Sequence, residues 1–197
     1  MATSTQSYHH GDLPGTLLRA AMELLEENGA GSLSLRAAAR RAGVSTAAPY
    51  RHFADRNALL SAIAAVGYRE LAVELLAAHP QPKTADDLAE IAIAYVRFAL
   101  TRPGLFRVMF TEGCDPTNAE RVAAVDAIQQ YLHSIVRQVF PTVAEEPMAT
   151  ATWGLVHGLA FLHLDGKLGD DHDVSPASTM AHRVRAAVLA AAGQVSA

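Results

Sequence analysis

The sequence is poor in the residues that would indicate a disulfide scaffold, a collagen-like fibre or a membrane protein. It has one cysteine and 13 glycines in 197 residues, which excludes a disulfide framework and a glycine-repeat fibre. No apolar run approaches the ~18 residues of a membrane-spanning helix. The polar N-terminal segment also lacks the apolar core of a secretory signal. We therefore expect a globular protein of the reducing cytoplasm.

The rest of the composition favours helices. Half of the residues are hydrophobic and the formal net charge is −4, a balance that excludes a largely disordered chain. Alanine, the strongest helix former, occurs 39 times, whereas aromatic residues make up only 6%. No stretch shows the sustained apolar–polar alternation with β-branched residues that is typical of strands. We predict an all-α protein.

Hydrophobic spacing, capping residues and helix breakers divide the chain into about nine helices. Their predicted ranges are 13–28, 35–42, 46–52, 56–78, 84–101, 105–111, 117–140, 145–166 and 176–192. We predict a disordered arm over 1–12, a three-helix domain over 13–54 and a larger helical domain over 55–197. The helix from 56 to about 78 connects the two domains.

The most specific motif covers residues 33–53, LSLRAAARRAGVSTAAPYRHF. Two short helices are separated there by the segment Ala42-Gly43-Val44-Ser45. Glycine permits the left-handed backbone that a tight turn between helices requires. Val44 is placed to fill the gap between the helices, and Ser45 is placed to cap the second helix. This spacing predicts a helix-turn-helix, whose second helix enters the major groove of DNA.

Positive charge gathers around the same motif. Residues 36–56 hold five arginines and one acid, which are Arg36, Arg40, Arg41, Arg51, Arg56 and Asp55. The local net charge of +4, five minus one, contrasts with −4 for the whole chain. A basic patch on an acidic body favours local contact with nucleic acid over wholesale coating.

The motif resembles the tetracycline-repressor (TetR) family of transcriptional regulators. The matching residues are Ala39, Ala42-Gly43-Val44-Ser45, Tyr50, His52-Phe53, Arg56, Leu59 and Leu60, preceded by Tyr8-His9-His10-Gly11-Asp12-Leu13. This resemblance covers about residues 8–65. Further along, Trp153, His157 and Gly158 resemble a type of ligand domain named after Trp, His and Gly (WHG). The resemblance implies a one-component regulator that binds a DNA operator.

Three residues at the start of the second short helix, Thr46, Ala47 and Ala48, are the expected base-facing residues. The two alanines offer only methyl contacts, for instance to thymine. The resemblance implies that the Tyr50 hydroxyl contacts a phosphate; the alternative is a core aromatic. Pro49 departs from the aliphatic residue that the family usually has, and it removes one backbone donor from the helix.

The remaining DNA-binding candidates are polar. Arg51 and His52 lie near the end of the second short helix, where a donor can reach the DNA backbone. Arg56 begins the next helix, where the helix dipole disfavours a cation and a phosphate would compensate. Ser34 and Arg36 are candidates for phosphate or base contacts. For Ser34 the alternative is helix capping alone, and for the others it is a solvated surface.

The segment 148–164 is apolar on nearly all sides. One apolar side has Leu155, Val156, Leu159 and Leu162. The other side has Trp153, His157, Ala160, Phe161 and Leu164. Such a helix is buried on most sides. We predict that 145–166 and 176–192 pair with their symmetry mates in a four-helix homodimer interface. The alternative is a central core helix in a monomer.

Aromatic residues and methionine concentrate in the second domain, as expected for an apolar effector cavity. The candidate ligand-binding residues are Phe98, Phe106, Met109, Phe110, Trp153 and Phe161, with His157 as the polar candidate. The alternative is a close-packed core in which His157 is simply hydrogen-bonded.

The sequence thus predicts a ligand-responsive repressor that binds a palindromic operator as a homodimer and is released by a small, largely apolar effector. We expect no enzyme, no cofactor and no metal, because paired carboxylates, a nucleophile elbow and a phosphate-binding glycine loop are missing. One alternative is a metal-dependent enzyme or metal sensor that uses His157, His163, Asp165, Asp170, Asp171, His172 and Asp173. Another is a DNA-binding module whose C-terminal half serves only for dimerisation.

Overall fold

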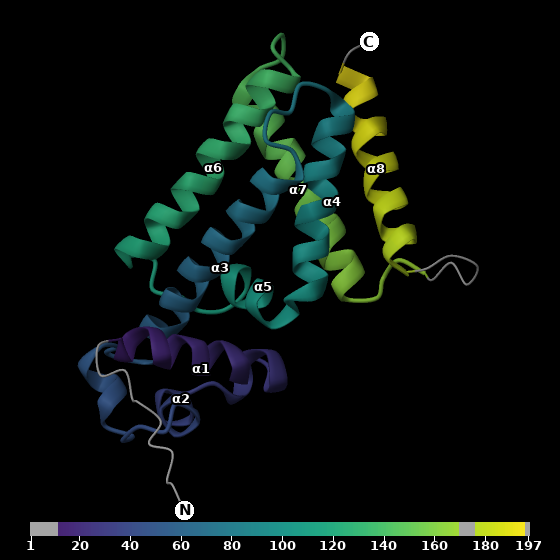
Figure 1. Ribbon diagram of the computed structural model, residues 1–197. Coiled ribbons are helices and arrows are strands. Elements are labelled where there is room, and N and C mark those ends of the chain that lie inside the picture. The colour runs from purple at the N-terminus through teal and green to yellow at the C-terminus, as the bar shows by residue number, and fades with distance from the viewer. Residues whose placement is uncertain (1–11, 170–175, 196–197) are drawn as a thin grey trace, which may run out of the picture.

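A computed structural model describes residues 12–169 and 176–195, and every regular element in these ranges is a helix (Figure 1). The eight α-helices of these ranges are α1 Leu13–Asn28, α2 Leu35–Arg41, α3 Arg56–Ala78, α4 Ala85–Thr101, α5 Pro103–Phe110, α6 Ala119–Val139, α7 Glu145–Leu164 and α8 Pro176–Val195. Two short 3-10 helices cover Ala30–Ser32 and Ala48–Arg51. The all-α prediction is confirmed. None of the described helices is long and apolar enough to cross a membrane. The predicted arm over 1–12 lies outside the described residues except for Asp12.

Side-chain caps fix where the N-terminal helices begin. Asp12 accepts a hydrogen bond from Gly15 N at 3.0 Å, Ser34 from Ala37 N at 3.1 Å, and Asp55 from Ala58 N at 2.8 Å. Each cap satisfies one of the backbone donors that a helix leaves free at its start. The starts of α1, α2 and α3 therefore agree with the sequence prediction.

The second short helix of the motif is the one element that differs clearly. A helix over 46–52 was expected, whereas the structure has a single 3-10 turn, Ala48–Arg51. An α-helix that begins at Thr46 would need a hydrogen bond from Pro49 N to the Ser45 carbonyl, and the proline ring would clash with that carbonyl. With the helix beginning at Ala48, Pro49 lies in the first turn, where no donor is needed.

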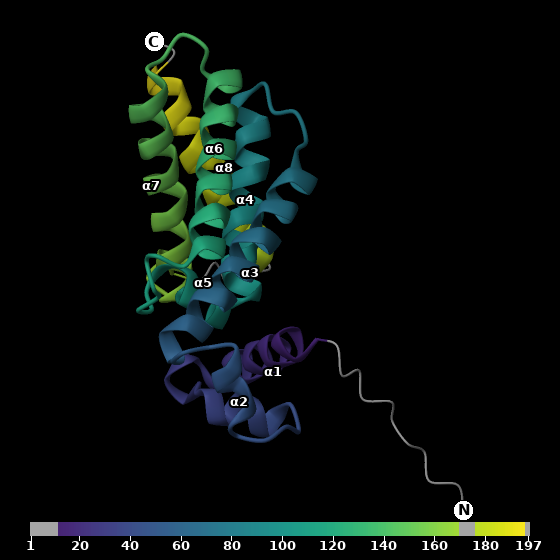
Figure 2. The same cartoon turned by 90° about the vertical axis from the view of Figure 1, so that its left-hand side faces the viewer.

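Helix α3 belongs to both parts of the molecule. Figures 1 and 2 show a small domain around α1 and α2 at one end, with α3 leading from it into the larger helical body. There α3 packs against α4, α5 and α6, while α4 also packs against α7 and α8. Helices α3 and α5 approach closely at Gly67, where a Cβ would lie 2.6 Å from Met109 Sδ.

Candidate functional site

The predicted DNA-binding residues lie on the small domain, and most of their side chains are exposed. Tyr50 is 52% exposed, which disfavours the alternative of a core aromatic. The other exposed members are Arg36, Thr46, Ala47, Arg51 and His52, whereas Ser34, Ala48 and Arg56 are partly buried. Phe53, directly after His52, is buried. The turn and the short 3-10 helix thus present hydroxyls and cationic donors outward.

The turn has the geometry that the glycine predicted. Gly43 has φ +68°, in the left-handed region that glycine adopts without strain. Directly after it, Val44 N donates to the Ala39 carbonyl at 3.0 Å. Val44 is partly buried against the core, and Pro49 is buried beneath the outward-facing residues. Packing of Val44 and Pro49 therefore holds the exposed segment in place.

Fewer arginines contribute to the exposed basic patch than the sequence of this segment contains. Arg41 pairs with Glu23 at 3.1 Å and with Glu27 across to α1, and its hydrogen bond lowers the pKa of the Glu27 carboxyl. Its charge is therefore largely compensated within the chain. Among the residues that the structure describes, Arg36, Arg40 and Arg51 are exposed and take part in no ion pair.

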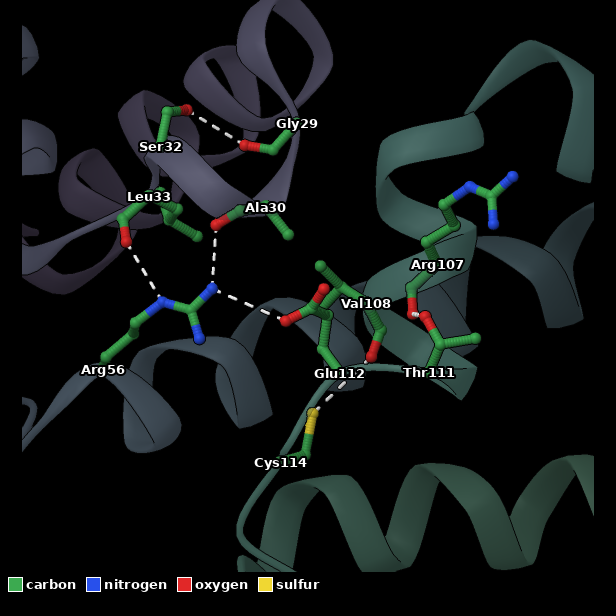
Figure 3. A network of polar contacts seen from close by, with 10 residues as sticks. All are labelled: Gly29, Ala30, Ser32, Leu33, Arg56, Arg107, Val108, Thr111, Glu112 and Cys114. Carbon is green, nitrogen blue, oxygen red and sulfur yellow. Dashed lines mark hydrogen bonds and ion pairs between the residues drawn. The ribbon is translucent and has the colours of Figure 1, made fainter.

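Arg56 has partners within the protein. Figure 3 shows its guanidinium between two backbone carbonyls of the small domain and the Glu112 carboxylate, which follows α5. Nε donates to the Leu33 carbonyl at 3.1 Å, and an Nη donates to the Ala30 carbonyl at 2.8 Å and to Glu112 at 3.5 Å. These contacts compensate the cation at the start of α3 in place of a phosphate. We therefore leave Arg56 out of the proposed DNA-binding surface.

A second arginine also joins the two domains. Arg102, between α4 and α5, donates to Glu26 of α1 at 3.0 Å and to Glu70 of α3 at 2.8 Å. Arg102, directly before α5, thus contacts α1 and α3. Glu112, directly after α5, contacts Arg56 of α3, which also binds the small domain. A shift of α5 would strain both contacts.

The larger domain contains a cavity of about 320 Å³, at the lower end of the usual range for ligand pockets. It is lined by Tyr68, Leu75, Leu88, Ile91, Ala92, Tyr95, Met109, Phe110, Arg121, Val125, Ile128, Gln129, Tyr131, Leu132, Ile135, Thr152, Trp153 and Val156. Three of the predicted ligand-binding residues, Met109, Phe110 and Trp153, are among them. The other four, Phe98, Phe106, His157 and Phe161, are not.

Of the four predicted residues outside the lining, Phe106, His157 and Phe161 pack against one another and His157 contacts the lining residues Phe110 and Trp153. Phe98 is fully buried, and the rings of Phe106 and Phe161 lie 5.8 and 4.9 Å from the His157 ring, centre to centre. The Tyr95 hydroxyl and His157 Nδ1 form a hydrogen bond of 2.9 Å. Burial lowers the pKa of His157 and raises the pKa of Tyr95, so both stay neutral near pH 7. His157 is therefore hydrogen-bonded within the protein, as the alternative interpretation held.

Several lining residues were not identified from the sequence. On α6 they recur at Arg121, Val125, Ile128 and Leu132, which is the spacing of one helix face. That spacing is visible in the sequence, but it does not distinguish a cavity wall from an ordinary amphipathic face. Tyr68 of α3 also lines the cavity; its hydroxyl donates to the Met109 carbonyl at 2.9 Å, and burial raises its pKa to about 12.

The outer side of α7 is apolar and open. Trp153 and Leu162 are 43% and 41% exposed, and Gly154 and Gly158 have open space where a side chain would be. On α8, in contrast, Val184 and Val188 are buried within the chain. The free apolar surface of the helix pair therefore lies mainly on α7.

The structure offers no support for the metal-site alternative. The part of the chain described in the structure has no group of three His, Cys, Asp or Glu side chains placed to hold a metal ion. Residues 170–173 of the predicted cluster lie outside that part. His163 Nδ1 lies 2.8 Å from the Leu159 carbonyl, and Asp165 pairs with Arg107.

A helix-turn-helix domain joined through one long helix to a hollow helical domain is the architecture of a ligand-responsive DNA-binding regulator. Comparison with protein families agrees with this class. Residues 17–63 match the bacterial regulatory proteins of the tetR family, and residues 88–187 match a tetracyclin repressor-like C-terminal domain. The protein belongs to the TetR family of transcription regulators and carries its helix-turn-helix domain. Trp153, His157 and Gly158 lie inside the second match.

The chain is also similar to individual proteins. A structure of a protein of unknown function from Rhodococcus sp. RHA1 is 34% identical, with a TM-score of 0.75 and 97% of each chain covered. The tetracycline repressor protein class A from transposon 1721 of Escherichia coli is 37% identical over 84 residues, which is 43% of this chain and 37% of that protein. A variant TetR from Acinetobacter baumannii AYE in complex with minocycline is 20% identical, with a TM-score of 0.61 over 89% of this chain and 94% of that one.

Proposed function

We propose that the protein is a repressor that binds a palindromic operator as a homodimer and is released when a small organic effector occupies the cavity. The observation that carries this proposal is the position of α3. Near its start Leu59 and Leu60 are buried in the hydrophobic core and α3 packs against α1, whereas further along Tyr68 and Leu75 line the cavity. One rigid element is thus shared by the DNA-binding surface and the ligand site.

The route from the cavity to the DNA-binding surface is short. Met109 and Phe110 line the cavity from the end of α5, and Glu112, two residues further on, contacts Arg56. A ligand that moves α5 would act on α3 through Gly67 and on the small domain through Arg56. The ligand shifts the equilibrium only if it binds the moved state more tightly.

The DNA-binding proposal is tested by selecting duplexes from a random pool with the wild-type protein. We expect one palindromic sequence to be enriched. Ala47→Gln should change the enriched bases, because its side chain faces outward at the start of the short helix. Tyr50→Phe should weaken binding to every sequence alike, because a phosphate contact carries no sequence information. Recovery of no common sequence would contradict the proposal.

The homodimer proposal places α7 at the interface. Gly154 and Gly158 are one turn apart and open, so a second helix can approach closely there, flanked by Leu162. A Cβ at Gly158 meets no atom within 4 Å, so Gly158→Leu should fold but lose the dimer. Leu100→Glu is the matched control, since Leu100 is 38% exposed on α4. Sedimentation of a wild-type monomer at micromolar concentration would refute the interface.

The effector proposal is tested by a thermal-shift screen of small organic compounds. A compound at ~100 times its Kd stabilises the fold by about 2.7 kcal/mol. Val125→Phe, on the cavity wall, should abolish the shifts, because the larger ring occupies the space. Shifts that survive in Val125→Phe would place the ligands elsewhere, and a screen without hits would favour the module whose C-terminal half only dimerises.

A further inference from the structure

The apolar cavity carries one cation. Among the described residues that line it, Arg121 of α6 is the only charged side chain, and no carboxylate is present. Arg121 Nε is shielded from solvent and has no hydrogen-bond partner. None of the ion pairs found among residues 12–169 and 176–195 includes Arg121. A guanidinium that is left partly unsatisfied in apolar surroundings is costly unless a ligand supplies an anion.

The groups around Arg121 do not supply that anion. Tyr68 and Cys114 lie close to Arg121, and burial raises the pKa of each, so both are neutral near pH 7. Asp115 is charged, but its Oδ1 accepts hydrogen bonds from Thr117 N at 2.8 Å and Thr117 Oγ1 at 2.7 Å. It takes part in no ion pair with Arg121. Arg121 Nε therefore keeps a donor without a partner, at a residue that lines the cavity.

The position of Arg121 gives the cavity two unlike ends. On α6 the lining runs from Arg121 to Ile135, which is roughly 21 Å along the helix at 1.5 Å per residue. Arg121 is the first of these residues and lies near Tyr68, on the side of the cavity toward the small domain. Past it the wall is mainly apolar, with Ile128, Leu132 and Ile135 following on α6.

We propose that the effector is an amphipathic organic acid, whose carboxylate binds Arg121 and whose hydrocarbon or aromatic body lies along α6 toward Ile135. This inference rests on the proposed effector-binding function of the same cavity. A carboxylate matches the planar fork of the guanidinium, and charge-assisted hydrogen bonds of this kind are about twice as strong as neutral ones. At ~30 Å³ for each water volume, the cavity of about 320 Å³ holds a small aromatic or short-chain acid.

The test compares acids with neutral and cationic compounds of the same shape. Benzoate, naphthoate and octanoate are titrated into the full-length protein, each beside its alcohol and its amine, by isothermal calorimetry. We expect at least one acid to bind ten or more times more tightly than its alcohol, and the amine to bind more weakly than both. In Arg121→Gln the preference for the acid should fall to about one, whereas Arg121→Lys should retain part of it. Arg97→Gln, an exposed cation on α4 outside the cavity, is the control and should retain all of it.

Three results would overturn the inference: equal affinity for acid and alcohol, an acid preference that survives in Arg121→Gln, or no binding of any acid in the millimolar range. Circular dichroism of Arg121→Gln separates lost binding from lost folding, and Arg121→Lys gives the result if Arg121→Gln does not fold. Operator binding by the same preparations separates the two claims. A protein that binds its operator but prefers no acid refutes this inference alone, and one that binds no operator refutes the proposed function.

Discussion

The DNA-binding domain and the helical body use their interiors in opposite ways. In the small domain Leu17, Ala21 and Leu59 are fully buried, and its functional candidates are on the outside. In the body, α6 buries only Ala124, Ile135 and Val136 over its 21 residues, and the space beside it forms the cavity. The first domain has a filled core beneath its exposed candidate residues, whereas the body leaves a cavity of about 320 Å³ beside α6.

This difference explains why the two domains need firm connections. A close-packed domain transmits displacement because its parts cannot yield separately. A hollow one is easier to rearrange, since some of its side chains have few neighbours on the cavity side. The contacts of Arg56 and Arg102 lie where these two kinds of packing meet.

The largest expected effect tests the difference in packing directly. Leu17→Ala, in the small domain, should lower the free energy of unfolding by about 3 kcal/mol, because it opens a cavity in a filled core. Leu132→Ala, at the cavity wall, should cost only about 1 kcal/mol, because Leu132 already borders empty space. Urea unfolding of both variants at one protein concentration measures the two losses. Equal losses would mean that the body is as close-packed as the small domain.

The next effect concerns the connection between the domains. Arg56→Met removes the donors of the Ala30 and Leu33 carbonyls and should destabilise the protein by about 2 kcal/mol. Arg51→Met, an exposed arginine of the same domain, is the control and should stay within about 0.5 kcal/mol of wild type. If the two variants unfolded alike, the Arg56 contacts would carry no stability. Urea unfolding provides the measurement.

A smaller effect separates the outward-facing charge from the compensated charge. Arg51→Gln should reduce the slope of log affinity against log salt by about one, because one phosphate contact is lost. Arg41→Gln should change this slope far less, because Glu23 and Glu27 already hold that guanidinium. Filter binding of the selected operator over a salt series measures both slopes. A larger change for Arg41→Gln than for Arg51→Gln would reverse the assignment of the basic surface.

The smallest effect is a pH dependence within the body. Burial lowers the pKa of His157 below the unfolded value of about 6.5, so the unfolded chain binds a proton first as the pH falls. The stability that depends on neutral His157 is therefore present above about pH 6.5 and lost below it. The loss stays below about 1.4 kcal/mol per pH unit, since only one proton is bound. Unfolding of wild type and His157→Gln from pH 7.5 to 5.5 should show a steeper decline for wild type; parallel curves would contradict the lowered pKa.

The helices were readable from the sequence because their signals are local. The caps Ser34 and Asp55 and the turn glycine Gly43 act over three or four residues, so helix starts followed from spacing alone. The prediction of a helix over 46–52 was wrong because it counted only the donor that Pro49 removes and not the clash of its ring. The geometric cause of the 3-10 turn was nevertheless visible in the sequence.

The site was less predictable because its contacts are distant in the sequence. The partners of Arg56 lie 26 and 56 residues away at Ala30 and Glu112, and no spacing rule joins them. Aromatic content correctly indicated the region of the cavity but not which rings line it, since that depends on how α5 and α7 rotate against α6. Arg121 was overlooked because an arginine at the start of an amphipathic helix usually lies in solvent.

The proposed function requires two DNA-binding surfaces held at a fixed spacing by one dimer. This is tested by changing the separation of the half-sites in the selected operator and measuring affinity at constant salt. Five added base pairs turn one half-site by about half a turn of the duplex, so a rigid dimer can no longer reach both major grooves. We predict a loss of affinity of at least about 100-fold. Unchanged affinity for the lengthened operator would show that the chains bind their half-sites independently, and it would contradict the account.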